Sequence, residues 1–337
     1  MRRLLFFPLA VILAAGCSDA LEQSTTAGQV IAVVSRDGSA LTLVSAADFT
    51  SANVTLVVSL GADARIASRG SVLLITSASS STIDLVDLAE RPYGLTATFP
   101  GPPPSPSASS AAIQDDSIAW ITSDNVLERL NYRTGAIGTA SVGNVTTAVA
   151  LTAGKVFVLS QNGTGIPAAP SYLSVVNPTT MLVEDSILLS GTRASNMTLG
   201  DDSLLYVVNS GLLSDSAGRL SIVDPVGRRE LVVINGLGAG AGPAVFHPSG
   251  RLLIASSVKG ILEVNTLTRS LTRGPDNPIT DGGQAVSGLA IDQARQVYAI
   301  DPDACAVTVL RAPPDYRKTR TPVVGGCPYS AAVAAIP

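Results

Sequence analysis

The stretch Ser221-Ile222-Val223-Asp224 is a short apolar strand that stops at a turn-forming residue, and this event occurs seven times along the chain. The other six ends are Leu43-Val44-Ser45, Leu85-Val86-Asp87, Arg129-Leu130-Asn131, Val175-Val176-Asn177, Glu263-Val264-Asn265 and Val309-Leu310-Arg311. Successive end residues lie 42, 44, 46, 47, 41 and 46 positions apart. A repeat of this length with several strands per unit predicts the blades of a β-propeller.

Three further strands are expected in each unit. An apolar strand precedes each end, at Val30–Val34, Val72–Thr76, Ile118–Thr122, Val156–Ser160, Leu204–Val208, Leu252–Ser256 and Gln296–Ile300. In six units a polar turn precedes this strand, and before the turn stands a strand of small residues such as Thr147-Ala148-Val149-Ala150-Leu151. Because the innermost strands of a propeller crowd around its axis, these small-residue segments are the expected inner strands. A fourth strand follows each end.

The two ends of the repeat array complement one another. The first unit lacks a small-residue strand, whereas the C-terminus has a spare one, Tyr329–Ile336. Pairing the spare strand with the first unit would close the ring and remove a free sheet edge. We therefore expect an all-β fold, a seven-bladed β-propeller of four-stranded blades over residues 29–337, with the C-terminal strand completing blade 1.

The repeats resemble the YVTN-type and NHL-like seven-bladed propellers. The resemblance is carried by Pro248-Ser249-Gly250 with the strand that follows it, by Leu205-Tyr206-Val207-Val208-Asn209, and by Ser221-Ile222-Val223-Asp224. It covers residues 29–337 and is clearest in blades 4 to 7 and loose in blades 2 and 3. What it implies is the fold, since propellers carry many unrelated functions.

The N-terminus has the pattern of an export signal. Arg2 and Arg3 precede a ten-residue apolar run, Leu4–Leu13, which is too short to span a bilayer as a helix. Leu13-Ala14-Ala15-Gly16-Cys17 resembles the lipobox of bacterial lipoproteins, which implies a signal peptide at 1–16 and lipidation of Cys17. Ser18 resembles the pattern that sends lipoproteins to the outer membrane, so a lipid-anchored protein facing the periplasm or the cell surface is expected. The alternative is an ordinary secretory signal with an incidental cysteine.

Residues 17–28 are small and polar without periodicity, which predicts a flexible tether behind the lipidated cysteine. Cys305 and Cys327 are the other two cysteines of the chain. In a propeller, the loop that holds Cys305 and the segment before the closing strand open on the same face, and export favours oxidation. A disulfide between them would close a loop of about 22 residues and contribute roughly 3 kcal/mol. The alternative is a pair of unpaired thiols.

The charged residues point away from several functions. The chain has 22 basic and 26 acidic residues, a net charge of −4 and no basic run, so nucleic acid is not an expected partner. The expected inner strands contain no Asp, Glu or His, and Arg65 is their only charged residue. His247, the single histidine, is expected in a turn. These observations predict no catalytic residue, metal site or cofactor at the axis.

The leading hypothesis is a lipid-anchored, non-catalytic binding or scaffold protein of the bacterial cell envelope. It would recognise a protein, peptide or glycan on one loop face, where Arg65, Asn196, Gln284 and Tyr329 are the candidate residues. One alternative is a propeller enzyme of the lactonase or isomerase kind. Another is an outer-membrane assembly scaffold like the quinoprotein-type propellers, whose Trp-rich blades are matched here only by Trp120 and, faintly, by Asn131-Tyr132-Arg133-Thr134-Gly135.

Overall fold

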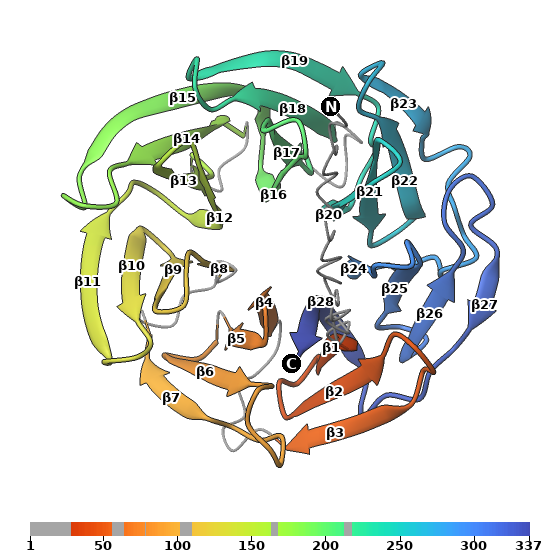
Figure 1. Cartoon of the computed structure of the whole chain (residues 1–337). Coiled ribbons are helices and arrows are strands. Elements are labelled where there is room, and N and C mark those ends of the chain that lie inside the picture. The colour runs from red at the N-terminus through yellow and green to blue at the C-terminus, as the bar shows by residue number, and fades with distance from the viewer. Residues whose placement is uncertain (1–27, 56–63, 78, 102–109, 163–167, 212–217) are drawn as a thin grey trace, which may run out of the picture.

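Seven four-stranded antiparallel sheets form a closed ring around a central axis (Figure 1). The computed structural model describes residues 28–337 except 56–63, 78, 102–109, 163–167 and 212–217. The expected all-β, seven-bladed propeller is therefore confirmed. Within the described part of the chain, no helix has the length and apolar character needed to cross a bilayer. The expected signal peptide, Cys17 and the tether up to residue 27 lie outside the described residues.

The blades follow one another along the chain, each running from the axis outward. Blade 1 contains β28 (Pro328–Ile336), β1 (Gly28–Ser35), β2 (Ala40–Ser45) and β3 (Ser51–Thr55); blade 2 contains β4 (Arg65–Arg69), β5 (Val72–Thr76), β6 (Thr82–Asp87) and β7 (Ala97–Pro100); blade 3 contains β8 (Ser110–Ile113), β9 (Ile118–Ser123), β10 (Val126–Asn131) and β11 (Ala136–Ser141). Blade 4 contains β12 (Thr146–Thr152), β13 (Lys155–Ser160), β14 (Pro170–Val176) and β15 (Val183–Thr192); blade 5 contains β16 (Ala194–Leu199), β17 (Leu205–Asn209), β18 (Arg219–Asp224) and β19 (Arg229–Asn235). Blade 6 contains β20 (Ala241–His247), β21 (Arg251–Ser256), β22 (Gly260–Asn265) and β23 (Ser270–Arg273); blade 7 contains β24 (Gly288–Ile291), β25 (Val297–Asp301), β26 (Ala306–Leu310) and β27 (Lys318–Arg320).

The C-terminal strand closes the ring as expected. β28 pairs antiparallel with β1, from Gly28 opposite Ile336 to Ser35 opposite Pro328, and the sheet order of blade 1 is β28-β1-β2-β3. β1 begins at Gly28, two residues before the expected strand start at Val30 and one before the expected domain boundary at 29. The two ends of the described chain are thus joined along nearly the whole of one strand, which leaves blade 1 with the same four strands as the others.

The strand-end residues that define the repeat stabilise the turns that follow them. Asp224 Oδ1 accepts hydrogen bonds from the backbone N–H groups of Val226 and Gly227, both at 2.9 Å. The side-chain oxygens of Asp87, Asn131, Asn177 and Asn265 accept in the same way from residues two or three positions onward. Such short polar side chains replace backbone partners in tight turns, which explains why the repeat recurs at these positions.

The core lies between neighbouring blades and is dominated by their second strands. The largest fully buried side chains include Trp120 on β9, Phe157 on β13, Tyr206 on β17 and Tyr298 on β25. Closer to the axis the space is smaller: a Cβ atom on Gly288 would stand 3.3 Å from the carbonyl oxygen of Tyr329 on the neighbouring blade. Large side chains therefore pack away from the axis, and small ones line it.

Some inner strands are longer than expected, and two of them gain a residue of a kind not expected there. β4 runs to Arg69 and β20 to His247, because each strand keeps pairing with its neighbour into the expected turn, Arg69 with Val72 and His247 with Arg251. The expectation that Arg65 is the only charged inner residue, with no histidine there, was therefore wrong. His247 is buried; its Nδ1 lies 2.7 Å from Ser249 Oγ and its Nε2 3.2 Å from the carbonyl oxygen of Arg295.

Cys305 and Cys327 form the expected disulfide, with their Cα atoms 4.2 Å apart. Cys305 lies in the loop between β25 and β26, and Cys327 directly precedes β28. The carbonyl oxygen of Cys327 also accepts a hydrogen bond from the backbone N–H of Arg36, in the β1–β2 turn, at 2.7 Å. The disulfide thus links blade 7 to the strand that closes blade 1.

Candidate functional site

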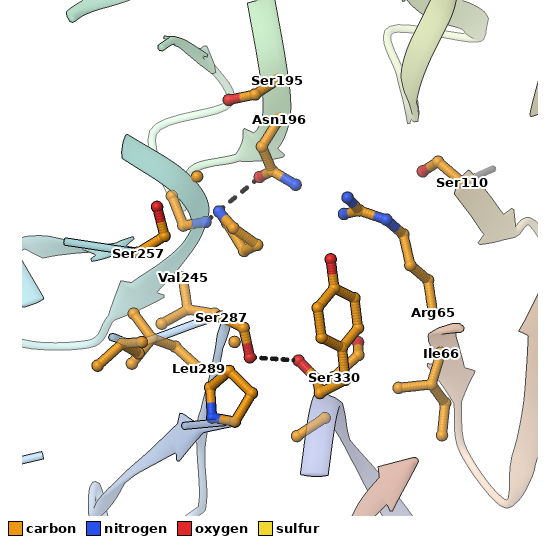
Figure 2. Close-up of a pocket in the computed structure, with 18 of the residues that line it drawn as sticks. Arg65, Ile66, Ser110, Ser195, Asn196, Val245, Ser257, Ser287, Leu289 and Ser330 are labelled. Atoms are coloured by element: carbon orange, nitrogen blue, oxygen red, sulfur yellow. Dashed lines mark hydrogen bonds between the residues drawn. The ribbon is translucent and has the colours of Figure 1, made fainter. Parts of the chain in front are cut away.

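A cavity of about 610 Å³ opens along the axis on one face of the ring. We call this side the cavity face; it carries the loops between second and third strands and the connections between blades. Residues from these segments lie at the mouth, among them Arg36, Ser257 and Asp303. Residues of the inner strands form the walls farther in, and Figure 2 shows several of them pointing toward the axis.

Arg65 is the central charged residue of this cavity. It opens β4, and its side chain extends toward the axis opposite Asn196 (Figure 2). Its Nε atom is buried and has no hydrogen-bond partner among the described residues. The five ion pairs of the described residues do not include Arg65. A cation in this position has lost part of its water without gaining a counter-ion, which raises its free energy.

Asn196 lies across the channel on β16, and its side-chain orientation is set by a backbone contact. Its Oδ1 accepts a hydrogen bond from the N–H of Ala244 on the next inner strand, at 3.3 Å. Because the oxygen is used in this way, the Nδ2 donors face the cavity and the guanidinium of Arg65 (Figure 2). Two donor groups therefore approach one another from opposite walls.

The remaining candidate residues have different positions. Tyr329 begins the inner strand of blade 1 and lines the cavity, and its carbonyl oxygen accepts a hydrogen bond from Ser287 Oγ at 2.7 Å. Gln284 is exposed in the bend before β24; its neighbour Ala285 lines the cavity, whereas Gln284 is absent from the wall. The structure thus brings Arg65, Asn196 and Tyr329 together around one space and leaves Gln284 beside it.

Sequence reasoning missed several groups in the same cavity. Ser110 of blade 3 faces the guanidinium of Arg65, and Ser195 beside Asn196 donates to backbone carbonyl oxygens of Val208 and Ala241 (Figure 2). Apolar side chains from three other inner strands, Ile66, Val245 and Leu289, complete the wall. All of these residues except Val245 stand at or near the start of an inner strand, and that shared position is the signal that would have found them.

A second cavity, of about 670 Å³, opens on the opposite face, where the turns between first and second strands lie. Two of its polar side chains, Lys155 and Gln114, have partners. Lys155 Nζ lies 2.7 Å from Glu184 Oε2, and this contact lowers the pKa of the glutamate. Gln114 accepts from Trp120 Nε1 at 2.8 Å and donates to Asp115 Oδ2 at 3.0 Å.

Ionisable groups that support catalysis or metal binding are sparse near the axial cavity. The residues that line it include one carboxylate, Asp303, which is exposed at the mouth. Across the described ranges, no group of three or more His, Cys, Asp and Glu side chains is arranged to hold a metal ion. His247 lies at the far end of β20, and its burial lowers its pKa.

Comparisons with known proteins identify the fold and no family. No family model matches the sequence, and no curated protein matches it either. Among solved structures, a functionally unknown protein from Desulfotomaculum acetoxidans DSM 771 is similar with a TM-score of 0.69 and 12% identity, over 91% of this chain and 99% of that chain. Kuenenia stuttgartiensis hydrazine synthase gives 0.64 and 13% over 80% and 88%, and Citrobacter koseri AztD gives 0.59 and 12% over 91% and 98%. At these identities the similarity establishes a shared β-propeller architecture.

Proposed function

We propose that this chain is a lipid-anchored, non-catalytic binding or scaffold propeller of the bacterial cell envelope, which holds a protein, peptide or glycan over its axial cavity. The observation that carries this proposal is the cavity itself. It combines a cation that has no counter-ion among the described residues, an amide donor and apolar wall residues on the face where the loops open. Ligand sites in rigid scaffolds have this composition: mostly apolar walls with a few convergent polar groups.

The non-catalytic part of the proposal is supported by the chemistry of the lining. A lactonase-type or isomerase-type site requires a general base or a cluster of metal ligands close to the substrate. Among the described residues of the wall, the inner part carries Arg65 and no carboxylate or imidazole. Donors of this kind bind and orient a ligand without moving protons.

The lipid anchor is supported by the sequence at 1–17, and the position of β1 indicates which face of the propeller such an anchor would turn toward the membrane. The start of β1 lies with the turns of the opposite face: Gln29 Oε1 accepts from the N–H of Gln293 in the β24–β25 turn at 2.7 Å. The eleven residues from Ser18 to Gly28 would span at most about 35–40 Å. Anchoring through Cys17 would therefore hold the cavity face away from the membrane, toward a partner. The repeat motifs further lead us to group the chain with the YVTN-type and NHL-like propellers.

Site-directed photocrosslinking in cells tests the binding face. A photoreactive residue at Gln284 samples the cavity face, and one at Leu267, exposed in the β22–β23 turn, samples the opposite face as the matched control. We expect a discrete crosslinked product from position 284 and none from 267, with the partner identified by mass spectrometry. Equal crosslinking from both positions, or products from 267 alone, would contradict the proposed face.

The anchor has its own test. Cys17→Ala removes the thiol that would be acylated, so the full-length variant should leave the membrane fraction and become soluble in the periplasm or medium. Ser18→Ala, next to it, is the control and should stay with the membrane. Membrane retention of Cys17→Ala would show that the lipid anchor is wrong while leaving the binding face untouched.

A further inference from the structure

We propose that the axial cavity binds the terminal carboxylate of a peptide whose last side chain is apolar, with Arg65 as the group that holds the carboxylate. This inference rests on the proposed binding function and names its ligand chemistry. It is carried by three features of one space: a half-buried cation whose Nε has no hydrogen-bond partner among the described residues, convergent hydrogen-bond donors, and an apolar wall beside them.

The charge of Arg65 calls for an anion. Its Nε is buried without a partner, and the one carboxylate of the described lining, Asp303, makes no ion pair with it. Because Arg65 is half-buried, its charge is partly desolvated, and a bound anion would stabilise it by completing an ion pair. The guanidinium presents parallel N–H groups whose spacing matches the two oxygens of a carboxylate.

The neighbouring polar groups also donate. Asn196 turns Nδ2 toward Arg65, because its Oδ1 is held by the N–H of Ala244. The hydroxyl of Ser110 faces the guanidinium from the adjacent blade (Figure 2). Donors that converge on one point with a single positive charge suit a monoanion, whereas a phosphate dianion is usually met by more than one cation.

The apolar part of the wall indicates which chemical group stands next to the bound carboxylate. Ile66 follows Arg65 directly, and Val245 and Leu289 lie on the other side of the cavity (Figure 2). These aliphatic side chains would bury an apolar side chain next to the carboxylate, which describes the C-terminal residue of a peptide. Sugar rings are commonly bound against aromatic faces, and Tyr329 is the one aromatic residue among those that line the cavity. The wall therefore favours a peptide over an acidic glycan.

Isothermal titration calorimetry on the detergent-solubilised full-length chain tests whether the axial cavity binds a peptide carboxylate through Arg65. The probes are acetyl-Ala-Ala-Leu with a free carboxylate, the same peptide as its carboxamide, and trigalacturonate. We expect the free acid to bind at least about tenfold more tightly than the amide, and Arg65→Gln to remove that difference. Arg65→Lys keeps the charge but lacks the parallel N–H groups of the guanidinium, so it should retain part of the affinity difference between the acid and the amide.

Arg69→Gln is the matched control, because it removes the same charge at the other end of the same strand, on the opposite face. It should leave the affinity for the free acid unchanged. Thermal melting without ligand checks folding: Arg65→Gln should melt at or above the wild-type temperature, since it removes a half-buried cation that has no counter-ion among the described residues. Asp63, two positions before Arg65, lies outside the described residues, and Asp63→Asn should preserve or raise the affinity.

Equal binding of acid and amide by the wild type, or binding that survives Arg65→Gln, would overturn the proposal. Tight binding of trigalacturonate without binding of the peptide would show that the ligand is an acidic sugar, and would overturn the peptide assignment. Loss of binding in Asp63→Asn would assign the recognition to that acid and refute the role of Arg65. A face-specific crosslink from Gln284 together with no carboxylate binding would leave the binding function standing and reject this ligand alone.

Discussion

Blades 2 and 3 differ from blades 4 and 5 at one buried position of the third strand, three residues before the strand end that defines the repeat. Blades 4 and 5 have Ser174 and Ser221 there, and both hydroxyls are hydrogen-bonded. Ser174 Oγ donates to the carbonyl oxygen of Val142 at 2.8 Å, and Ser221 Oγ accepts from Asn209 Nδ2 at 2.9 Å. Blades 1 and 7 have threonines at this position and blade 6 has a leucine, Leu262.

Blades 2 and 3 have carboxylic acids instead, Asp84 and Glu128, which are 0% and 3% exposed. Asp84 Oδ1 accepts from Thr98 Oγ1 at 2.8 Å, but its Oδ2 has no partner among the described residues, and neither does Oε1 of Glu128. Burial raises the pKa of Glu128 to about 7 and the pKa of Asp84 above its usual value. The same backbone position thus accepts a hydroxyl at little cost, whereas burial favours the protonated form of an acid there. These are also the two blades whose sequence resembles the propeller repeat least.

The largest effect on stability is expected when a carboxylic acid is introduced in blade 4, where the native residue at this position is a serine. Ser174→Glu would bury a carboxyl in a packed site where the serine hydroxyl donates to the carbonyl oxygen of Val142, at a cost of about 4 kcal/mol of unfolding free energy at pH 8. Ser174→Ala, the control, loses one buried hydrogen bond and about 1 kcal/mol. Urea denaturation measures both. A glutamate tolerated here as well as alanine would mean that the blades are equivalent at this position.

The reverse substitution should stabilise blade 3. As pH rises from about 4.5 to 7, the unfolded chain releases the proton of Glu128 while the folded chain keeps it, so the free energy of unfolding falls. A difference of about 2.5 between the two pKa values corresponds to a loss of roughly 3 kcal/mol by pH 8. Glu128→Gln should remove this loss and match the wild type near pH 4. Its control, Glu90→Gln, changes an exposed glutamate and should keep the wild-type slope. A wild-type protein whose stability is flat from pH 5 to 8 would refute the buried acid.

The architecture was predictable because propeller geometry repeats in the sequence. Asp224 and its equivalents recur since each caps a turn with its side chain, and the unmatched segment at Tyr329 identified the closing strand before any coordinates were known. The Cys305–Cys327 disulfide followed from knowing which loops share a face. The lengths of β4 and β20 were missed because one further backbone pair, such as His247 with Arg251, leaves no mark in a polar turn sequence.

The candidate site was less predictable because it depends on distances across the axis. Arg65 and Asn196 could be proposed as inner-strand polar residues, but the orientation of the amide depends on the N–H of Ala244, a residue 48 positions away. Gln284 was placed by counting along a connection, and the bend before β24 decides where it lies. The buried acids carried a usable signal that was overlooked: position −3 from each strand end is polar in six of the seven units.

The smallest expected effect on stability concerns the difference between the two buried acids, Asp84 and Glu128. Asp84 has one donor, Thr98 on the exposed edge strand β7, and Glu128 has none among the described residues. Thr98→Val keeps the shape of the side chain and removes that donor, so it should raise the pKa of Asp84 further and cost up to about 1 kcal/mol at pH 8. Below the pKa of free aspartate the carboxyl is protonated in both the folded and the unfolded chain, and the cost should shrink. A double-mutant cycle with Asp84→Ala isolates the pair, because Thr98→Val should be nearly neutral once the carboxyl is gone. If instead Thr98→Val costs the same in both backgrounds, the threonine stabilises its edge strand alone, and Asp84 is as unsupported as Glu128.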